Sequence, residues 1–195
     1  YDQRKQPKKA QECLIKLTKL VPTNPDPYKE LARLYFLNEQ HDLAQKTLEE
    51  AKENIFEHSE KKVPDYELMN MLSDLYIARG EWSKVLELVK WTESRNRTSA
   101  PIPIELVVKS GQAYANLKEP AKATEQLSHL LSLAVTPFAD LYYEAATTLS
   151  SKEVGLHEEA LKYYKQLVTV PEYDKPGVWL QISHSLRTVG NLAET

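Results

Sequence analysis

The side chains that could carry catalysis or hold a metal are few in this 195-residue chain, and their spacing suits neither task. His58, His129 and His184 have no Cys, His or carboxylate at the spacing that a metal site requires. The segment HEEA at 157–160 lacks the second histidine of the helical zinc motif. The sequence has neither a Gly-rich phosphate loop nor a serine nucleophile motif. We therefore predict no metal, no cofactor and no enzymatic activity.

Charge and cysteine content argue against further classes of function. The net charge is −3 and the pI is about 6.0, which is unlike a general nucleic-acid clamp. A basic stretch at 4–19 is typical of a solvated helix face rather than a phosphate site. The single cysteine, Cys13, cannot form an internal disulfide, and we expect it to be a buried structural thiol. No apolar run approaches the ~20 residues of a membrane span.

The elements that carry these residues are expected to be helices. Apolar and small residues recur at i, i+3, i+4 and i+7 along most of the chain, and alternating strand patterns are scarce. The pattern also repeats along the chain. Apolar or small residues stand four and seven positions after each of five residues: Ala10, Ala44, Val85, Ala123 and Ala160. This resembles the tetratricopeptide repeat (TPR), whose period is about 34 residues. The resemblance implies an all-α TPR superhelical solenoid of antiparallel helix pairs.

The repeat phase resumes after the proline-containing connector at 95–105, so the sequence predicts a single array over residues 1–195. The predicted parts are the second half of one repeat at 1–24, full repeats at about 25–62, 63–101, 102–136 and 137–174, and the first half of another at 175–195.

Small residues are expected where the two helices of each pair cross, because a larger side chain would hold the axes apart. They are Ala32, Ser73, Gly111, Ala146 and Ser183 on first helices, and Ala10, Ala44, Ala123 and Ala160 on second helices. Three glycines, Gly80, Gly155 and Gly190, are predicted to supply positive φ in the turn that joins a pair.

Arrays of this kind bind partners along an extended concave surface. We expect the concave surface to form a groove that binds a segment of a partner protein. Apolar side chains of the groove would bury side chains of the segment, and polar side chains, with Lys29 and Arg33 as exposed charges, would select among segments. The predicted partner-binding residues are Lys29, Arg33, Phe36, Leu37, Asn70, Asp74, Ile77, Gln112, Asn116, Tyr143, Thr147, His184 and Arg187.

A narrower resemblance involves two segments, ELMNMLSDLYIARGEWSKVLELVKWTESRNR (67–97) and IPIELVVKSGQAYANL (102–117). Their succession looks like the TPR subunit of TFIIIC, the assembly factor for RNA polymerase III. In that family a repeat ending in a basic stretch is followed by a connector and a Pro-Ile-(Asp/Glu)-Leu sequence. The resemblance implies a nuclear scaffold that bridges promoter-bound TFIIIC to the initiation factor TFIIIB. Its partners would be TFIIIB and other TFIIIC subunits, and no catalytic residue is implied.

Two alternatives stay open at this point. One is an unrelated TPR adaptor in ubiquitin ligation, trafficking or signalling, with a cytoplasmic location. The other is a regulatory repeat segment of a larger enzyme. We expect no membrane association under any of these interpretations.

Direct contact with DNA is predicted to be weak or absent. Any binding by the isolated chain should rest on lysines and phosphates, and should therefore fall steeply between about 50 and 200 mM salt. Fluorescence anisotropy with labelled duplexes measures this. Sequence-specific binding that survives the higher salt would instead favour a direct role on DNA.

Overall fold

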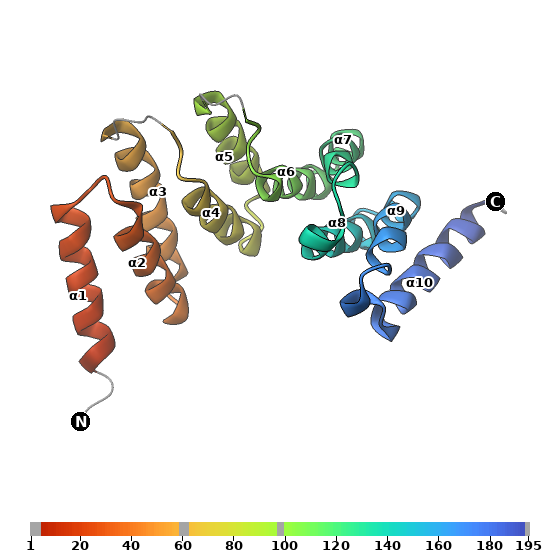
Figure 1. Ribbon diagram of the computed structural model, residues 1–195, viewed down its shortest axis with the longest axis horizontal. Helices are drawn as coiled ribbons and strands as arrows, with labels where there is room; N and C mark the ends of the chain where they lie inside the picture. Colours follow the sequence, from red (N-terminus) through yellow and green to blue (C-terminus); the bar gives the residue numbers. More distant parts are fainter. Residues whose placement is uncertain (1–4, 59–62, 97–99, 194–195) are drawn as a thin grey trace. The chain divides into compact units, whose positions relative to one another are not determined.

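The computed structural model describes residues 5–58, 63–96 and 100–193, and in these ranges it contains ten α-helices, two short 3-10 helices and no strand (Figure 1). The all-α class is therefore confirmed. The helices are α1 (Lys5–Leu20), α2 (Pro25–Leu37), α3 (His41–His58), α4 (Tyr66–Ala78), α5 (Trp82–Arg95), α6 (Ile104–Asn116), α7 (Pro120–Leu131), α8 (Ala139–Ser150), α9 (His157–Leu167) and α10 (Pro176–Ala193). The 3-10 helices are η1 (Thr136–Phe138) and η2 (Pro171–Tyr173).

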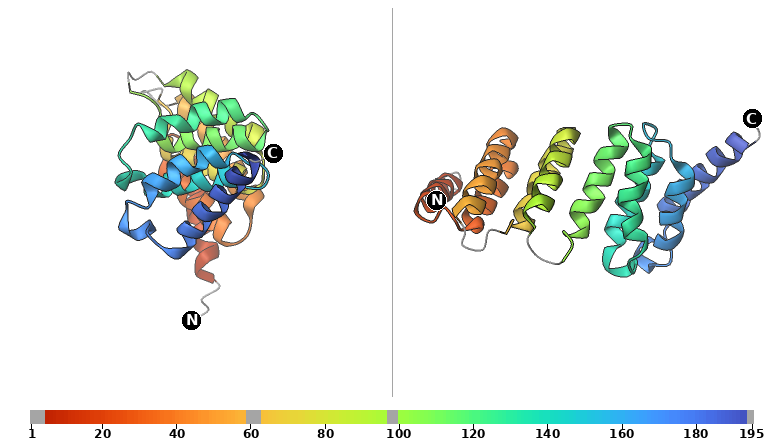
Figure 2. Two further views of the ribbon diagram at one scale, coloured as in Figure 1. Left: turned by 90° about the vertical axis from the view of Figure 1, so that its right-hand side faces the viewer. Right: turned by 90° about the horizontal axis from the view of Figure 1, so that it is seen from above.

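The chain divides into two compact units, and the boundary falls between Ile102 and Pro103. In the first unit α2 pairs with α3 and α4 with α5, while α1 packs on α2 and α3 on α4. In the second unit α6 pairs with α7 and α8 with α9, and α10 packs on α9 (Figure 2). The predicted single array and its repeat boundaries stay predictions.

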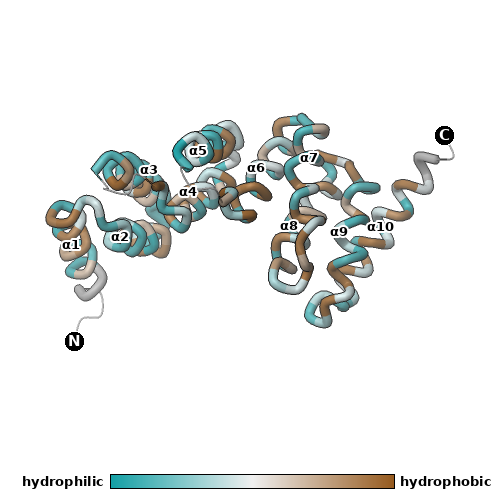
Figure 3. Tube along the Cα trace, turned by 45° about the horizontal axis from the view of Figure 1, so that its top comes forward, coloured by the Kyte–Doolittle hydropathy of each residue, from teal (hydrophilic) through white to brown (hydrophobic). Residues whose placement is uncertain are grey.

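Local signals in the sequence start these helices. Before α2, the side chain of Asn24 accepts a hydrogen bond from the Asp26 amide at 3.0 Å, and Pro25 occupies the first turn. Before α4, Asp65 accepts from the Leu68 amide at 2.8 Å. Hydrophobic and hydrophilic residues are interspersed along the helices, as expected for helices with one buried face (Figure 3).

The four turns that join paired helices share two features, a closing backbone hydrogen bond and one residue with positive φ. In each turn a backbone amide donates to a carbonyl five residues earlier, as in Glu81 to Tyr76 at 2.8 Å, or seven residues earlier in the longer α8–α9 turn. Gly80 and Gly155 supply the positive φ that such a turn requires, at 69° and 70°. Glu39 and Lys118 adopt it at 60° and 63°, although L residues there carry a steric cost.

The crossing points of the helix pairs are closely packed, as the sequence predicts. The small residues Ala44, Ala123, Ala146 and Ala160 are fully buried, and Ala32 is 1% exposed. Gly111 shows how close the helices come, because a Cβ there would lie 2.6 Å from Cγ of Leu127 on α7. Only a glycine fits at this point without a shift of Leu127.

Four expectations about single residues are wrong. Gly190 lies inside α10 and not in a turn. Cys13, Ala10 and Ser183 are exposed rather than buried. Ala10 and Ser183 lie on α1 and α10, whose corresponding faces are open, whereas equivalent residues of the complete pairs are covered by the partner helix.

The second unit has a dense aromatic core that includes Tyr142, Tyr163 and Tyr164. The rings of Tyr142 and Tyr163 meet edge to face with centroids 6.0 Å apart, joining α8 to α9. The Tyr142 hydroxyl shares its one proton between the carbonyl oxygens of Leu130 and Leu133, at 2.8 and 3.0 Å, so it is satisfied in its buried position. Burial also raises the pKa of Tyr142.

The crossing constraint predicts that Gly111→Ala is destabilising. Helix propensity alone would favour alanine by about 0.5–1 kcal/mol. The added methyl group meets the buried Leu127, however, and we expect a net loss of about 1–3 kcal/mol in the free energy of unfolding. Denaturant unfolding measures the change. The matched control is Gly190→Ala in α10, where a new Cβ meets nothing within 4 Å and the substitution should be neutral or stabilising.

Candidate functional site: an apolar groove between α2 and α4

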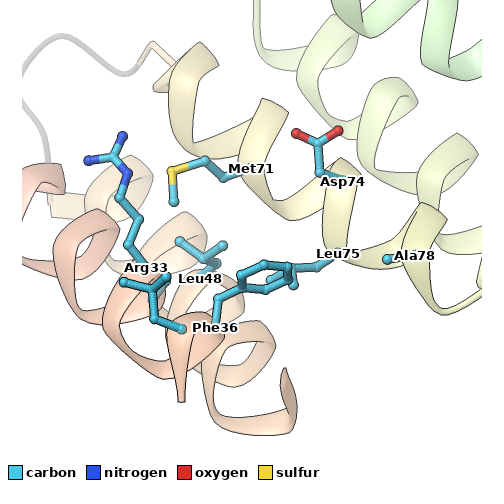
Figure 4. Close-up of a pocket in the computed structure, with 9 residues that line it drawn as sticks. Arg33, Phe36, Leu48, Met71, Asp74, Leu75 and Ala78 are labelled. Carbon is cyan, nitrogen blue, oxygen red and sulfur yellow. The ribbon is translucent and has the colours of Figure 1, made fainter. Parts of the chain in front are cut away.

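A pocket of about 570 Å³ lies between the first helices of the first unit (Figure 4). From α2 it is lined by Ala32, Arg33, Phe36 and Leu37, and from α4 by Met71, Asp74, Leu75 and Ala78, with Leu48 of α3 behind them. Seven of the nine lining residues are apolar. The pocket therefore offers an apolar surface with a charged residue on each helix.

Two side chains of α2 leave much of this apolar surface open to solvent. Phe36 is 50% exposed and Leu37 is 78% exposed. The Phe36 ring meets His41 edge to face with centroids 4.9 Å apart. Across the groove, Met71, Leu75 and Ala78 follow one another at i, i+4 and i+7 and so share a face of α4. Large exposed apolar side chains opposite such a face are typical of a binding surface.

A cluster of charges closes one end of the α2–α4 interface. Lys29 is 7% exposed, and its ammonium group lies 2.5 Å from Glu67, 3.2 Å from Asp26 and 3.9 Å from Asp65. Arg33 joins the same cluster by donating to Glu67 at 2.9 Å. The expectation that Lys29 is an exposed charge is wrong, because these carboxylates hold it between the two helices.

The charged groups in this cluster shift one another's pKa. Burial opposes the charge on Lys29, but the hydrogen bonds to Glu67 and Asp26 outweigh it, and the pKa of Lys29 is raised. The hydrogen bond from Lys29 lowers the pKa of the Glu67 carboxyl, and Arg33 lowers it further. Both groups therefore stay charged across the neutral range, and the cluster links α2 to α4 there.

The structure brings four of the predicted groove residues together in this pocket: Arg33, Phe36, Leu37 and Asp74. Met71, Leu75 and Ala78 were not predicted. Their spacing beside Asp74 was a usable signal, but it resembles that of an ordinary core stripe. Asn70 and Ile77 lie on α4, partly buried and outside the lining of the pocket.

The other predicted groove residues lie in the second unit. Gln112 donates to Glu144 at 3.3 Å, which links α6 to α8. Asn116 and Thr147 each donate to a carbonyl of their own helix. Tyr143 is 38% exposed, with its ring centroid 5.8 Å from that of Tyr173. The remaining two residues, His184 and Arg187, are exposed on α10, where the His184 ring centroid lies 5.7 Å from that of His157. Their role in binding stays a prediction.

The described ranges contain no group of three or more His, Cys, Asp or Glu side chains that could hold a metal ion. In the same ranges no helix is both long and apolar enough to cross a membrane. His157 is buried, and its Nδ1 lies 3.2 Å from the Ser185 hydroxyl. Burial, together with the nearby His184, lowers the pKa of His157. These contacts join α9 to α10 and suit a packing role.

Three solved structures share this arrangement of helices, whereas no protein-family profile and no curated protein matches the sequence. YrrB, a TPR protein with an unusual peptide-binding site, is 17% identical, with 94% of this chain and 84% of that chain covered and a TM-score of 0.60. MamA is 19% identical, with 84% and 88% covered and a TM-score of 0.57. A Podosopora anserina chain with nearly identical TPR-like repeats, assigned to the kinesin light chains, is 18% identical, with 89% and 90% covered and a TM-score of 0.67.

At these identities the likeness establishes the fold, which is the all-α TPR solenoid predicted from the sequence. TPR proteins are typically non-enzymatic scaffolds for protein–protein interaction. None of the three links this chain to TFIIIC, so the assignment to TFIIIC stays a prediction.

The charged cluster predicts how stability depends on pH. The pKa of Glu67 is lowered on folding, so its contribution is complete above the unfolded-state value of about 4.3 and is lost as pH falls through the folded-state pKa. The raised pKa of Lys29 acts in the opposite sense and matters only above about pH 10. Glu67→Gln should therefore be less stable than the wild type at pH 7, and the two should converge in acid.

Unfolding free energies measured from pH 7 down to about pH 3 test this expectation. Glu50→Gln is the control, because Glu50 is an exposed carboxylate of α3 in an i,i+4 pair with Lys46 at 3.9 Å. A gap between wild type and Glu67→Gln that stays constant with pH would contradict the assigned role of the cluster.

Proposed function

We propose that the chain is a protein–protein interaction scaffold and that the α2–α4 groove captures a segment of a partner protein. The observation that carries the proposal is the apolar pocket of about 570 Å³ with Phe36 and Leu37 exposed on its α2 side. The fold supports it, since TPR proteins typically serve as interaction scaffolds. One structural neighbour is itself described as having a peptide-binding site.

The groove suits a segment with one or two large apolar side chains. Phe36, Leu37 and Met71 offer contacts to such side chains, and Arg33 and Asp74 provide opposite charges on the two helices. The segment is helical or extended and orders as it binds, because anchors of this kind read a few side chains at regular spacing. Lys29 takes no direct part, since it is held within the α2–α4 charge cluster.

The particular assembly we propose is TFIIIC. The supporting observation is the sequence resemblance of residues 67–97 and 102–117 to its TPR subunit. The protein would then be nuclear and would bridge promoter-bound TFIIIC to TFIIIB. Affinity purification of the full-length protein tests this assignment. TFIIIC subunits and TFIIIB among the specifically retained proteins would support it, and their absence would favour an unrelated adaptor.

The groove predicts a separation of binding from stability. In Phe36→Ala/Leu37→Ala, two exposed apolar contacts are lost, and we expect partner affinity to fall at least about tenfold. The melting temperature should change little, because both side chains are half or more exposed. Co-purification with wild-type and variant baits, followed by titration of the retained partner, measures the effect.

The control is Lys46→Ala/Glu50→Ala on α3, whose side chains are 72% and 59% exposed. Glu49 and Lys52 are poorer controls, since Glu49 accepts from the Tyr76 hydroxyl at 2.8 Å and Lys52 lies over the Trp91 ring. Equal binding by the groove variant and the control would place the partner site elsewhere on the protein.

A further inference from the structure

The charged groups beside the α2–α4 groove are unequal in number. Together with Glu30, which pairs with Arg33, the α2–α4 charge cluster holds four carboxylates and two cations. The carboxylates are those of Asp26, Glu30, Asp65 and Glu67, and the cations are Lys29 and Arg33. The formal net charge of the cluster is therefore −2. Asp74, which lines the pocket itself, adds a further negative charge.

Exposure makes this imbalance larger at the surface that a partner meets. The side chains of Glu30 and Glu67 are 57% and 55% exposed, whereas that of Lys29 is 9% exposed. Arg33 is 47% exposed, but its guanidinium group donates to Glu30 on its own helix and to Glu67 on α4. Both cations are thus already paired within the protein. The surface around the apolar groove is therefore negative.

The negative charges lie on both sides of the apolar part of the groove. On α4, Glu67 comes four residues before Met71 and Asp74 three residues after it, so the three share one face of the helix. At about 1.5 Å per residue, the two carboxylates are separated by roughly 10 Å along the helix axis. Figure 4 shows Met71 between Arg33 and Asp74, with Phe36 on the α2 side of the pocket. An apolar side chain bound against Met71 therefore has an acidic residue on either side.

We propose that the α2–α4 groove binds a basic segment, which places one large apolar side chain against Phe36 and Met71 and a Lys or Arg on each side of it. The proposal rests on the proposed function, to which it adds the chemistry of the partner. Burial of the apolar side chain supplies affinity. The flanking cations supply specificity and a faster encounter with the negative surface, since complementary charges steer association.

Each flanking cation has carboxylates to meet. One pairs with Glu30 and Glu67 near the start of α4, and the other pairs with Asp74. A carboxylate offers about four acceptor positions, so it can bind a partner's cation and keep the contacts it makes within the protein. An acidic segment meets like charges instead, and it reaches Arg33 only by displacing Glu30 or Glu67. Like charges brought together across an interface disfavour binding.

A peptide library tests the charge of the partner separately from the groove itself. Short random peptides displayed on phage are selected on the 195-residue chain. Peptides that also bind the Phe36→Ala/Leu37→Ala variant are discarded, so the remaining peptides depend on the groove. These peptides should be enriched in Lys and Arg within one helical turn of a large apolar residue, on both sides of it.

A charge reversal is the decisive measurement. The tightest selected peptide is compared by fluorescence anisotropy with a copy in which Glu replaces its flanking Lys and Arg. The wild type should prefer the basic peptide by about tenfold, and less so as salt rises from about 50 to 200 mM. The variant Glu30→Lys/Asp74→Lys should lose or reverse this preference, and because both residues are exposed it should fold, which melting curves verify. Glu50→Lys on α3 is the matched control and should keep the preference.

The outcomes separate this proposal from the proposed function. Groove-dependent peptides that are acidic or uncharged would overturn the basic partner and leave the groove as a binding site. Equal affinity for the basic peptide and its Glu copy, or a preference that Glu30→Lys/Asp74→Lys leaves intact, would do the same. A library that yields no groove-dependent peptide would overturn the proposed function and the basic partner with it.

Discussion

The close crossing of the two helices in each pair is the contact on which the rest of the structure depends. At Gly111 and Leu127 the two helices come so near that one extra carbon would overlap a buried side chain. Helices this close are joined by a short turn, and all four such turns contain a left-handed residue. In the first unit the two pairs stack mainly through α3 on α4, with α2 beside α4, and in the second unit α6 packs on α8. The groove between α2 and α4 is a product of that stacking.

Much of the fold was predictable because small residues mark the places where the paired helices cross. Small residues at the crossing points, with Val85 in one of these places, recur at intervals of 34 to 41 residues, and they identified the helix pairs and the fold. Turn chemistry was less informative. Gly80 and Gly155 were recognised, whereas Glu39 and Lys118 adopt the same backbone conformation without any sign in their side chains. The hydrogen bond that closes the turn imposes this conformation, and packing of the two helices offsets its steric cost.

The candidate site was less predictable than the fold, because exposure depends on what lies across from a residue. Lys29 and Arg33 are four residues apart on one face of α2, and nothing in their spacing or type distinguishes a buried charge from an exposed one. Glu67 of α4 and Asp65, the residue just before α4, lie beside the ammonium group of Lys29. The side chain of Arg33, in contrast, is 47% exposed. Met71 and Leu75 were missed for the same reason, since a groove wall and a core stripe have the same spacing.

The placement of the three tryptophans has a consequence for how unfolding is observed. Trp82 and Trp91 lie on α5 in the first unit, and Trp179 lies on α10 in the second. Helices of a solenoid are stabilised mainly by their neighbours, so the two units need not lose structure at the same denaturant concentration. Tryptophan fluorescence therefore reports mainly on α5 and on α10, and it reports little on the tyrosine core of α8 and α9. Amide hydrogen exchange would report on that core directly, with the slowest exchange expected beneath Tyr142 and Tyr163.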